Sequence, residues 1–200
     1  EKAYNEFKND IAKENADVKE AGKKAIKNLN KADKPYKKHG WCNTSYYKAL
    51  VYERVGEYDE ALNELDGCAP GLYRHDEREE RNVLKAQVLV IQNKFAPAIE
   101  AYQIAQIAYD MQSHKFISMY RYAGELEKLY ANMNDYENAL KYNYLKDSSY
   151  GIKKTLSDFY HKKLAEKNIP VKWEALFNEA QENDKAGNRT TAYEKYTEAL

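Results

Sequence analysis

Apolar and polar residues alternate along most of this chain with the period of an α-helix. From residue 43 onward, apolar positions recur three or four residues apart, and glycine or asparagine interrupts them at intervals. The pattern predicts an all-α protein with helices at about 43–55, 57–69, 77–92, 94–111, 114–133, 135–149, 153–167, 171–186 and 188–200.

One short motif returns along the chain: a glycine or asparagine, an aromatic residue two positions later and an alanine five positions later. It stands in "RVGEYDEAL", "QNKFAPAIEAY" and "MNDYENALKY", and "KAGNRTTAYEKY" carries it with Arg189 in the aromatic place. Glycine and asparagine tolerate the left-handed geometry that ends a helix. Gly56, Asn93, Asn134 and Gly187 are therefore predicted to close the first helix of four pairs.

Small and large residues keep fixed distances from the four motif alanines, which are Ala61, Ala98, Ala139 and Ala192. Twelve residues before and seven after them, three of four residues are small: Ala49, Ala86, Glu127 and Ala180, then Cys68, Ala105, Lys146 and Ala199. Nine before and four after, three of four are large: Tyr52, Leu89, Tyr130 and Asn183, then Leu65, Tyr102, Asn143 and Tyr196. Small side chains let two helices approach closely, and large ones fill the groove that remains. The spacing predicts helical hairpins.

This small–large–small pattern, with a period somewhat above 34 residues, resembles tetratricopeptide repeats over about residues 42–200. The resemblance implies a right-handed α-solenoid of stacked antiparallel hairpins, at about 42–75, 79–112, 114–150 and 171–200. An insertion at 152–168, with the apolar stripe Ile152, Leu156, Phe159 and Leu164, is expected to be an extra helix or an extension of the preceding helix past Gly151.

Residues 1–40 form a separate N-terminal region with its own apolar stripe. The stripe comprises Tyr4, Phe7, Ile11, Val18, Ala21, Ala25 and Leu29. We expect one or two helices that cap the array at 41–200, with a degenerate repeat as one form of this cap and a free amphipathic arm as the alternative.

Charge and composition exclude several classes of protein. The 32 basic residues balance 32 acidic ones, which argues against a binder of duplex nucleic acid. No run of about 18 apolar residues is present, so we expect no membrane insertion by this segment. The chain begins with Glu1 and ends at Leu200 in the last turn of a repeat, and we therefore expect a piece of a longer protein.

Motifs that carry chemistry are not found. The sequence holds no phosphate-binding glycine loop, no nucleophile elbow and no pair of histidines at metal-ligand spacing, since His39, His75, His114 and His161 lie on separate segments. We expect no enzyme activity, no metal and no cofactor. Cys42 and Cys68 lie at the two ends of the first hairpin and are interpreted as small buried residues, with a disulfide as the alternative.

A concave wall is the predicted binding surface, because first helices line the inner side of a right-handed stack. Its residues are Tyr46, Tyr47, Leu50, Val83, Leu84, Gln87, Ile91, Arg121 and Lys128. An aromatic and aliphatic wall favours a peptide or a partner helix as ligand. The alternative is that the N-terminal helices or the chain's own C-terminal segment fill the groove. The carboxylate clamp of chaperone-binding tetratricopeptide domains is not reproduced, since Glu125 reverses the sign at one clamp position.

The run "NDYENALKYNYLKDSSY", followed by a charged helix, also looks like helical repeat regions of bacterial sensor proteins, especially from Bacteroidetes. This second resemblance implies the sensory or regulatory region of a larger bacterial signalling protein. An extracytoplasmic place in a membrane-anchored parent is then expected, with the cytoplasm as the alternative. The hypothesis is a non-catalytic scaffold for a protein or peptide ligand; its alternatives are a self-associating adaptor that forms a homodimer and an accessory domain of an enzyme.

Overall fold

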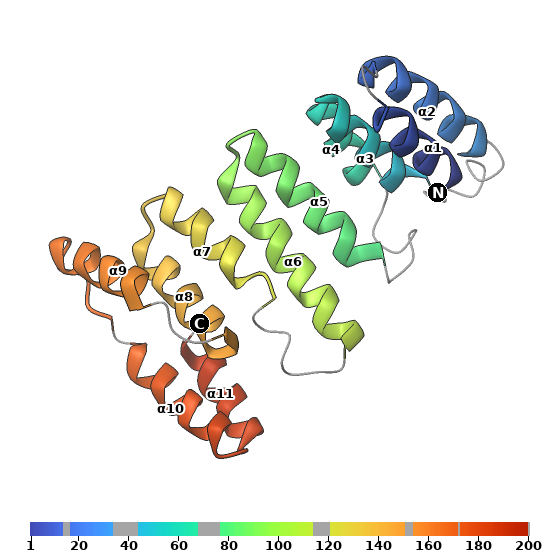
Figure 1. Cartoon of the computed structure of the whole chain (residues 1–200). Helices are drawn as coiled ribbons and strands as arrows, with labels where there is room; N and C mark the ends of the chain where they lie inside the picture. Colours follow the sequence, from blue (N-terminus) through green and yellow to red (C-terminus); the bar gives the residue numbers. More distant parts are fainter. Residues whose placement is uncertain are drawn as a thin grey trace. The chain divides into compact units, whose positions relative to one another are not determined.

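A computed structural model of the chain describes residues 1–13, 17–33, 44–67, 77–113, 121–150, 154–171 and 173–199. Within these ranges every regular element is an α-helix, so the predicted all-α class is confirmed. The chain divides into two compact units, Glu1–Ala108 and Tyr109–Leu200, and each is described by itself. Figure 1 labels the helices along the chain.

The first unit contains the predicted N-terminal helices and the first two predicted hairpins. Its helices are α1 (Lys2–Ile11), α2 (Val18–Asp33), α3 (Ser45–Val55), α4 (Tyr58–Asp66), α5 (Glu77–Ile91) and α6 (Phe95–Ser113), the last of which continues past the division between the units. Helix α3 packs against α4 and against both α1 and α2, and α5 packs in the same way against both α3 and α4. Each new first helix therefore rests on both helices of the preceding pair.

The second unit contains α7 (Ala123–Asn132), α8 (Tyr136–Tyr150), α9 (Lys154–Glu166), α10 (Glu174–Lys185) and α11 (Arg189–Ala199). Helices α7 and α8 pair, α10 and α11 pair, and α9 packs against α8. Helix α7 begins nine residues later than the predicted start at 114, because Arg121 and Tyr122 form a turn and Tyr122 occupies the N-cap position. Residues 114–120 lie outside the described ranges.

The same left-handed turn closes the first helix of each predicted hairpin. The φ angle is +82° at Gly56 and Gly187, +57° at Asn93 and +59° at Asn134. After each turn residue, a backbone N–H donates to the carbonyl five residues earlier, as from Glu57 to Tyr52 at 2.9 Å. This bond is typical of a Schellman motif, which satisfies carbonyls at the helix end. The four predicted turns are confirmed, and Asn168 ends α9 in the same geometry, with φ +55°.

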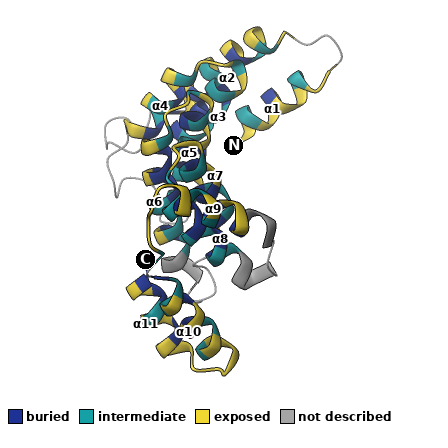
Figure 2. Cartoon of the chain, turned by 90° about the vertical axis from the view of Figure 1, so that its left-hand side faces the viewer, coloured by how far each residue is buried: buried dark blue, intermediate teal, exposed yellow. Residues whose placement is uncertain are grey.

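The motif alanines lie where paired helices touch. Ala61, Ala98 and Ala139 are fully buried and Ala192 is 2% exposed. Ala49 on α3 and Ala61 on α4 belong to one core cluster with Leu65, Leu84 and Val88, so the predicted contact between the two helices is confirmed. Figure 2 shows that buried positions occupy the faces that helices turn toward their neighbours.

Helix α9 is a separate helix whose inner face differs from the predicted stripe. Leu164 is buried as predicted, but Phe159 is 45% exposed and the neighbouring Tyr160 is buried instead. Ile152 and Leu156 lie outside the residues whose side chains are described. The Phe159 prediction is wrong because Tyr160 points its hydroxyl at a buried carboxylate of α7, which turns Phe159 outward.

The core of the second unit is aromatic. Phe177 of α10 is fully buried, and its ring lies 5.3 Å from those of Trp173 and Tyr196 and 6.0 Å from that of Tyr144 on α8. Edge contacts of this kind join α8, α10 and α11. Among the helices described in the two units, none is long and apolar enough to cross a membrane.

Enlarging a contact alanine is expected to destabilise the first unit. Ala49→Leu inserts three carbon atoms between α3 and α4, where no space remains, and should lower the free energy of unfolding by about 1–3 kcal/mol. The control is Ala96→Leu at an exposed position of α6, which should change the free energy of unfolding by less than about 0.5 kcal/mol. Urea unfolding followed by circular dichroism measures both, and equal stability of the two variants would contradict the packing account.

Candidate functional site

The predicted wall begins on α3, where Tyr46, Tyr47 and Leu50 are half-buried. The ring of Tyr47 lies 5.8 Å from that of Tyr46 and 5.9 Å from that of Tyr4 on α1. Tyr47 also packs against the core cluster that α1 and α2 form around Phe7. The N-terminal helices thus cover part of this aromatic surface and add Tyr4 to it.

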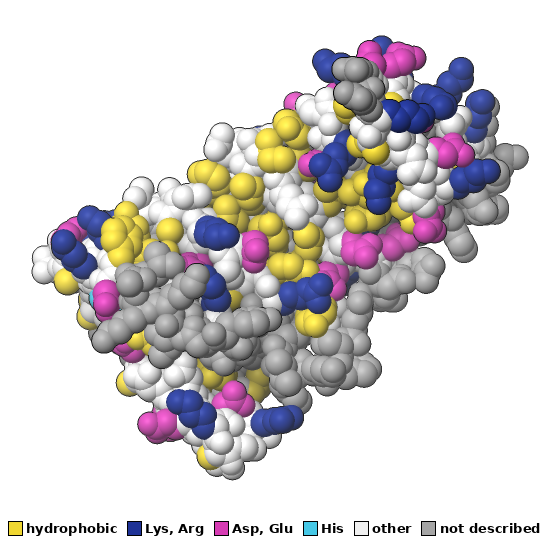
Figure 3. All heavy atoms as spheres, in the orientation of Figure 1, with side chains coloured by type: hydrophobic (Ala, Val, Ile, Leu, Met, Phe, Trp, Pro, Cys, Tyr) yellow, Lys and Arg dark blue, Asp and Glu magenta, His cyan; other side chains and the backbone are white. Residues whose placement is uncertain are grey.

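On α5 the predicted wall residues separate into accessible and buried ones. Ile91 is 47% exposed, Gln87 is exposed and Val83 is half-buried. Leu84 is 4% exposed and belongs to the core between α3, α4 and α5, where a ligand does not reach it. Figure 3 shows apolar side chains gathered over α5 and α6 on one face of the molecule.

Arg121 and Lys128 belong to the second unit, and both are exposed. The guanidinium of Arg121 lies 4.2 Å from the centre of the Tyr109 ring, at cation–π distance. Cys42 and Cys68 lie outside the described residues, so their interpretation as small buried residues, with a disulfide as the alternative, stays a prediction.

Negative charge surrounds the aromatic part of the wall. Burial, followed by the nearby carboxylates of Glu80 and Glu77 and two neighbouring tyrosines, raises the pKa of Tyr46 to about 12. Both glutamates belong to the first turn of α5, where acidic side chains also stabilise the positive end of the helix dipole. The wall is therefore aromatic on α3 and acidic at its edge on α5.

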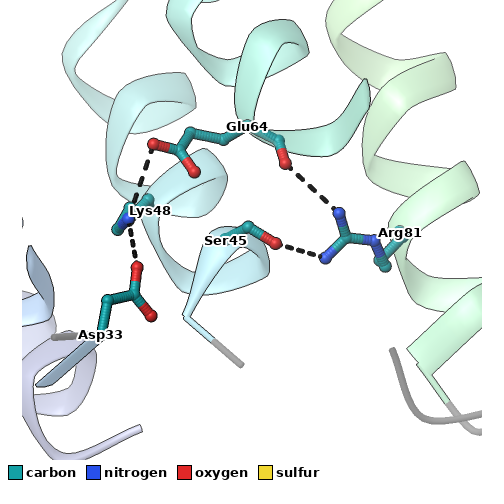
Figure 4. Close-up of polar contacts among 5 residues, drawn as sticks. All are labelled: Asp33, Ser45, Lys48, Glu64 and Arg81. Atoms are coloured by element: carbon teal, nitrogen blue, oxygen red, sulfur yellow. Dashed lines mark hydrogen bonds and ion pairs between the residues drawn. The ribbon is translucent and has the colours of Figure 1, made fainter. Parts of the chain in front are cut away.

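A second group of candidate residues is a set of buried charges beneath the wall, drawn in Figure 4. The ammonium of Lys48 on α3 lies 2.5 Å from a carboxylate oxygen of Asp33 at the end of α2, and 3.7 Å from Glu64 on α4. Arg81 on α5 donates to the hydroxyl of Ser45 at 2.8 Å and to the backbone carbonyl of Leu65 at 3.0 Å. Lys48 and Arg81 thus link α2, α3, α4 and α5.

One of these ion pairs repeats in the next hairpin. Lys48 stands immediately before the small residue Ala49 and pairs with Asp33, the last residue of α2. Lys85 stands immediately before the small residue Ala86 and pairs with Asp66, the last residue of α4, at 2.6 Å. The same bond thus joins two successive first helices to the end of the preceding helix.

The third polar cluster lies in the second unit around Glu127, which is 2% exposed. Its carboxylate accepts hydrogen bonds from Asn143 of α8 at 3.0 Å and from the Tyr160 hydroxyl of α9 at 3.1 Å, and it pairs with Lys146 at 3.2 Å. Glu127, Asn143 and Lys146 are the residues that break the small–large pattern in the third hairpin. The departures from the pattern therefore occur together and compensate one another.

The chemistry open to these buried groups is limited by their partners. Asp33 and Glu127 are each held by a cation, and no group of three or more His, Cys, Asp or Glu among the described residues is arranged to hold a metal ion. His161, on the outer surface of α9, lies 3.3 Å from Glu174. The buried charges hold neighbouring helices together. Replacing one partner of such a pair would leave the other charge buried and unpaired, which is strongly destabilising.

Comparison of the chain with protein-family models, with curated proteins and with solved structures found no match.

Removing one hydroxyl from the Glu127 cluster is expected to destabilise the second unit. Tyr160→Phe leaves a buried carboxylate without one of its donors and should lower the free energy of unfolding by about 1–3 kcal/mol. Tyr142→Phe is the control, because the half-buried Tyr142 ring stacks on Tyr130 and its hydroxyl contributes no hydrogen bond to this cluster. Thermal and urea unfolding measure both; a loss no larger in Tyr160→Phe than in Tyr142→Phe would contradict the role of Tyr160.

The raised pKa of Tyr46 predicts an alkaline loss of stability. The Tyr46 hydroxyl loses its proton near pH 10 in the unfolded chain and near pH 12 in the folded chain. Its contribution to the free energy of unfolding is therefore complete below pH 10 and declines as the pH rises through that interval. Tyr46→Phe should flatten the fall of the unfolding free energy between these two values. Urea titrations at stepped pH measure the slope, and an unchanged slope in the variant would refute the assignment.

Proposed function

We propose that the chain is a right-handed α-solenoid of tetratricopeptide-like hairpins. Three repeated features support this proposal: the left-handed turns, the buried alanines between paired helices, and the placing of each first helix of the first unit against both helices of the preceding pair.

The N-terminal helices α1 and α2 are included in the array as its first, degenerate hairpin. The backbone N–H of Ala21 donates to the carbonyl of Asp17 at 3.0 Å, as the N–H of Ala61 does to the carbonyl of Glu57. Ala21 is thus the fourth residue of α2, as Ala61 is the fourth residue of α4. The Lys48–Asp33 and Lys85–Asp66 pairs support the same equivalence, because α2 and α4 each present a terminal aspartate to the next first helix.

We further propose that the chain is a non-catalytic scaffold that binds a protein or peptide on the wall of its first helices. The observation that carries this proposal is the accessible apolar surface of α3 and α5, where Ile91 is 47% exposed at the end of α5 and Val83, Leu50 and Tyr46 are half-buried. Exposed apolar side chains of this size mark interaction surfaces when they adjoin one another. The context that we propose is a regulatory or sensory region of a larger bacterial signalling protein.

A self-associating adaptor is the second candidate function, because two copies could cover the same wall in a symmetric dimer. The two functions differ in what covers Ile91. Light scattering at low protein concentration separates them: a monomer with a free wall favours the scaffold, and a dimer that Ile91→Asp dissociates favours the adaptor.

The scaffold proposal predicts that a charge on the exposed part of the wall weakens partner binding. Ile91→Asp should reduce capture of a wall-bound partner at least about tenfold, because the carboxylate would have to be desolvated in an apolar contact. The control is Met133→Asp, which changes an equally exposed apolar residue in the second unit. Pull-down with quantitative mass spectrometry compares the chain with both variants after circular dichroism has verified their folding. Partners retained equally by both variants would contradict the proposal.

A further inference from the structure

A groove between α2 and α3 lies outside the wall of first helices. It encloses about 430 Å³, and its floor is apolar: Gly22 and Ile26 of α2 face Val51 and Val55 of α3. A methyl group on Gly22 would stand 2.6 Å from the Val55 side chain, so the glycine is what allows α2 to lie this close to α3. Tyr52, Glu57 and Asn30 complete the lining.

A row of lysines forms one rim of this groove. The four side chains follow one another at every fourth position of α2, and all are exposed: Lys19, Lys23, Lys27 and Lys31. Residues four apart are neighbours on the surface of a helix, so the four ammonium groups form a line along one side. Figure 3 shows basic side chains gathered over this end of the first unit.

The row of lysines destabilises the helix on which it lies. Like charges four residues apart repel one another and destabilise a helix, and the row contains such pairs along its whole length. Lys23 lies 3.8 Å from Glu20 in a fully exposed pair, and the described residues offer no ion pair to Lys19, Lys27 or Lys31. By contrast, Lys24, one position outside the row, pairs with Asp10 at 3.0 Å. Lys24 thus has an acidic partner across the helix pair, whereas three of the four row lysines have none among the described residues.

The charge of the groove is strongly one-sided in a chain that is neutral as a whole. Its lining contains four lysines and one acid, Glu57, whereas the complete sequence has 32 basic and 32 acidic residues. A local row of this kind is not explained by solubility, which depends on the net charge. The groove would suit a negatively charged ligand with an apolar body, since its floor offers hydrophobic contact and its rim offers positive charge.

We propose that this groove binds an acidic amphipathic helix, with its apolar side on the half-buried Ile26 and Val55 and its carboxylates on the lysine row. From Lys19 to Lys31 the row extends for about 18 Å at the rise of an α-helix, which matches about three turns of a ligand helix. Acids at every third or fourth position of the ligand would pair with successive lysines. The site is independent of the wall on α3 and α5 and of its proposed function.

The apolar floor distinguishes this ligand from other polyanions. A nucleic acid would engage the lysines through its phosphates and would leave the accessible parts of Ile26 and Val55 without contacts. A membrane surface would need apolar side chains that protrude, whereas these side chains lie at the bottom of a groove. An acidic helix uses both parts of the site.

The test measures binding of a synthetic acidic peptide by the complete chain. The probe is an amidated, acetylated helix of about 15 residues with leucine on one side and glutamate on the other, and its control has glutamine in place of every glutamate. We expect saturable binding of the glutamate peptide and at least about tenfold weaker binding of the glutamine peptide. Equal binding of both peptides, or no binding of either, overturns the proposal.

Variants locate the site on the chain. Lys27→Glu combined with Lys31→Glu should weaken binding of the glutamate peptide at least about tenfold, and Asn30→Trp, which fills the groove without changing its charge, should do the same. The matched control, Lys162→Glu with Lys185→Glu, makes the same change in net charge at exposed positions of the second unit and should leave affinity within about twofold. Circular dichroism verifies the fold of each variant.

Two outcomes separate the groove from simple charge attraction. If Asn30→Trp binds the glutamate peptide fully while the lysine variant does not, the peptide contacts the lysine row alone. This result would overturn the proposed binding in the groove. Binding of a duplex oligonucleotide, or of phosphatidylserine vesicles, more tightly than the glutamate peptide would assign the row to another class of partner and overturn the proposal. Isothermal titration calorimetry and vesicle sedimentation give these comparisons.

Discussion

Close approach of paired helices at alanine is the constraint on which the rest of this structure depends. At Ala49 and Ala61 the facing side chains are single methyl groups without exposed surface, so the backbones of α3 and α4 can lie near each other. The remaining groove is filled by large residues such as Leu65, and this alternation fixes the relative position of the two helices. Each pair then presents a defined surface to the next first helix. The wall on α3 and α5 results from this arrangement, because its residues lie at the margin of the core, where Tyr46 and Leu50 pack with one side only.

Buried charge adds order to a fold that apolar packing would leave less specific. Lys48 contacts acids from two different helices, and Arg81 reaches backbone carbonyls at the end of α4, where helix carbonyls lack partners. These bonds are directional, so a sliding of one hairpin over another would leave a charge buried and unpaired. Apolar contacts set how close the helices come, and the ion pairs set their register along the axis.

The local structure was predictable to a large extent, because it depends on residues that are near in sequence. Gly56 and Asn134 have left-handed φ angles since few other residues accept them, and the same argument located Asn93 and Gly187. The long-range polar contacts were not predictable in this way. Nothing in the local pattern shows that Asp33 lies opposite Lys48 or that Ser45 lies opposite Arg81. The burial of Leu84 was missed for the same reason: a position on a first helix can face the core or the ligand, and the period alone does not distinguish the two.

The Glu127 cluster has a consequence for how this chain can be divided or extended. In a regular array, a hairpin can be duplicated, deleted or transplanted because neighbouring interfaces are alike. The third hairpin lacks this freedom, since Glu127 of α7 needs the hydroxyl of Tyr160 on α9 as well as Asn143 on α8. The unit that could be grafted intact is therefore the three-helix block α7 to α9. A chimaera that separates α9 from α7 would carry Glu127 into the new core without the hydroxyl of Tyr160.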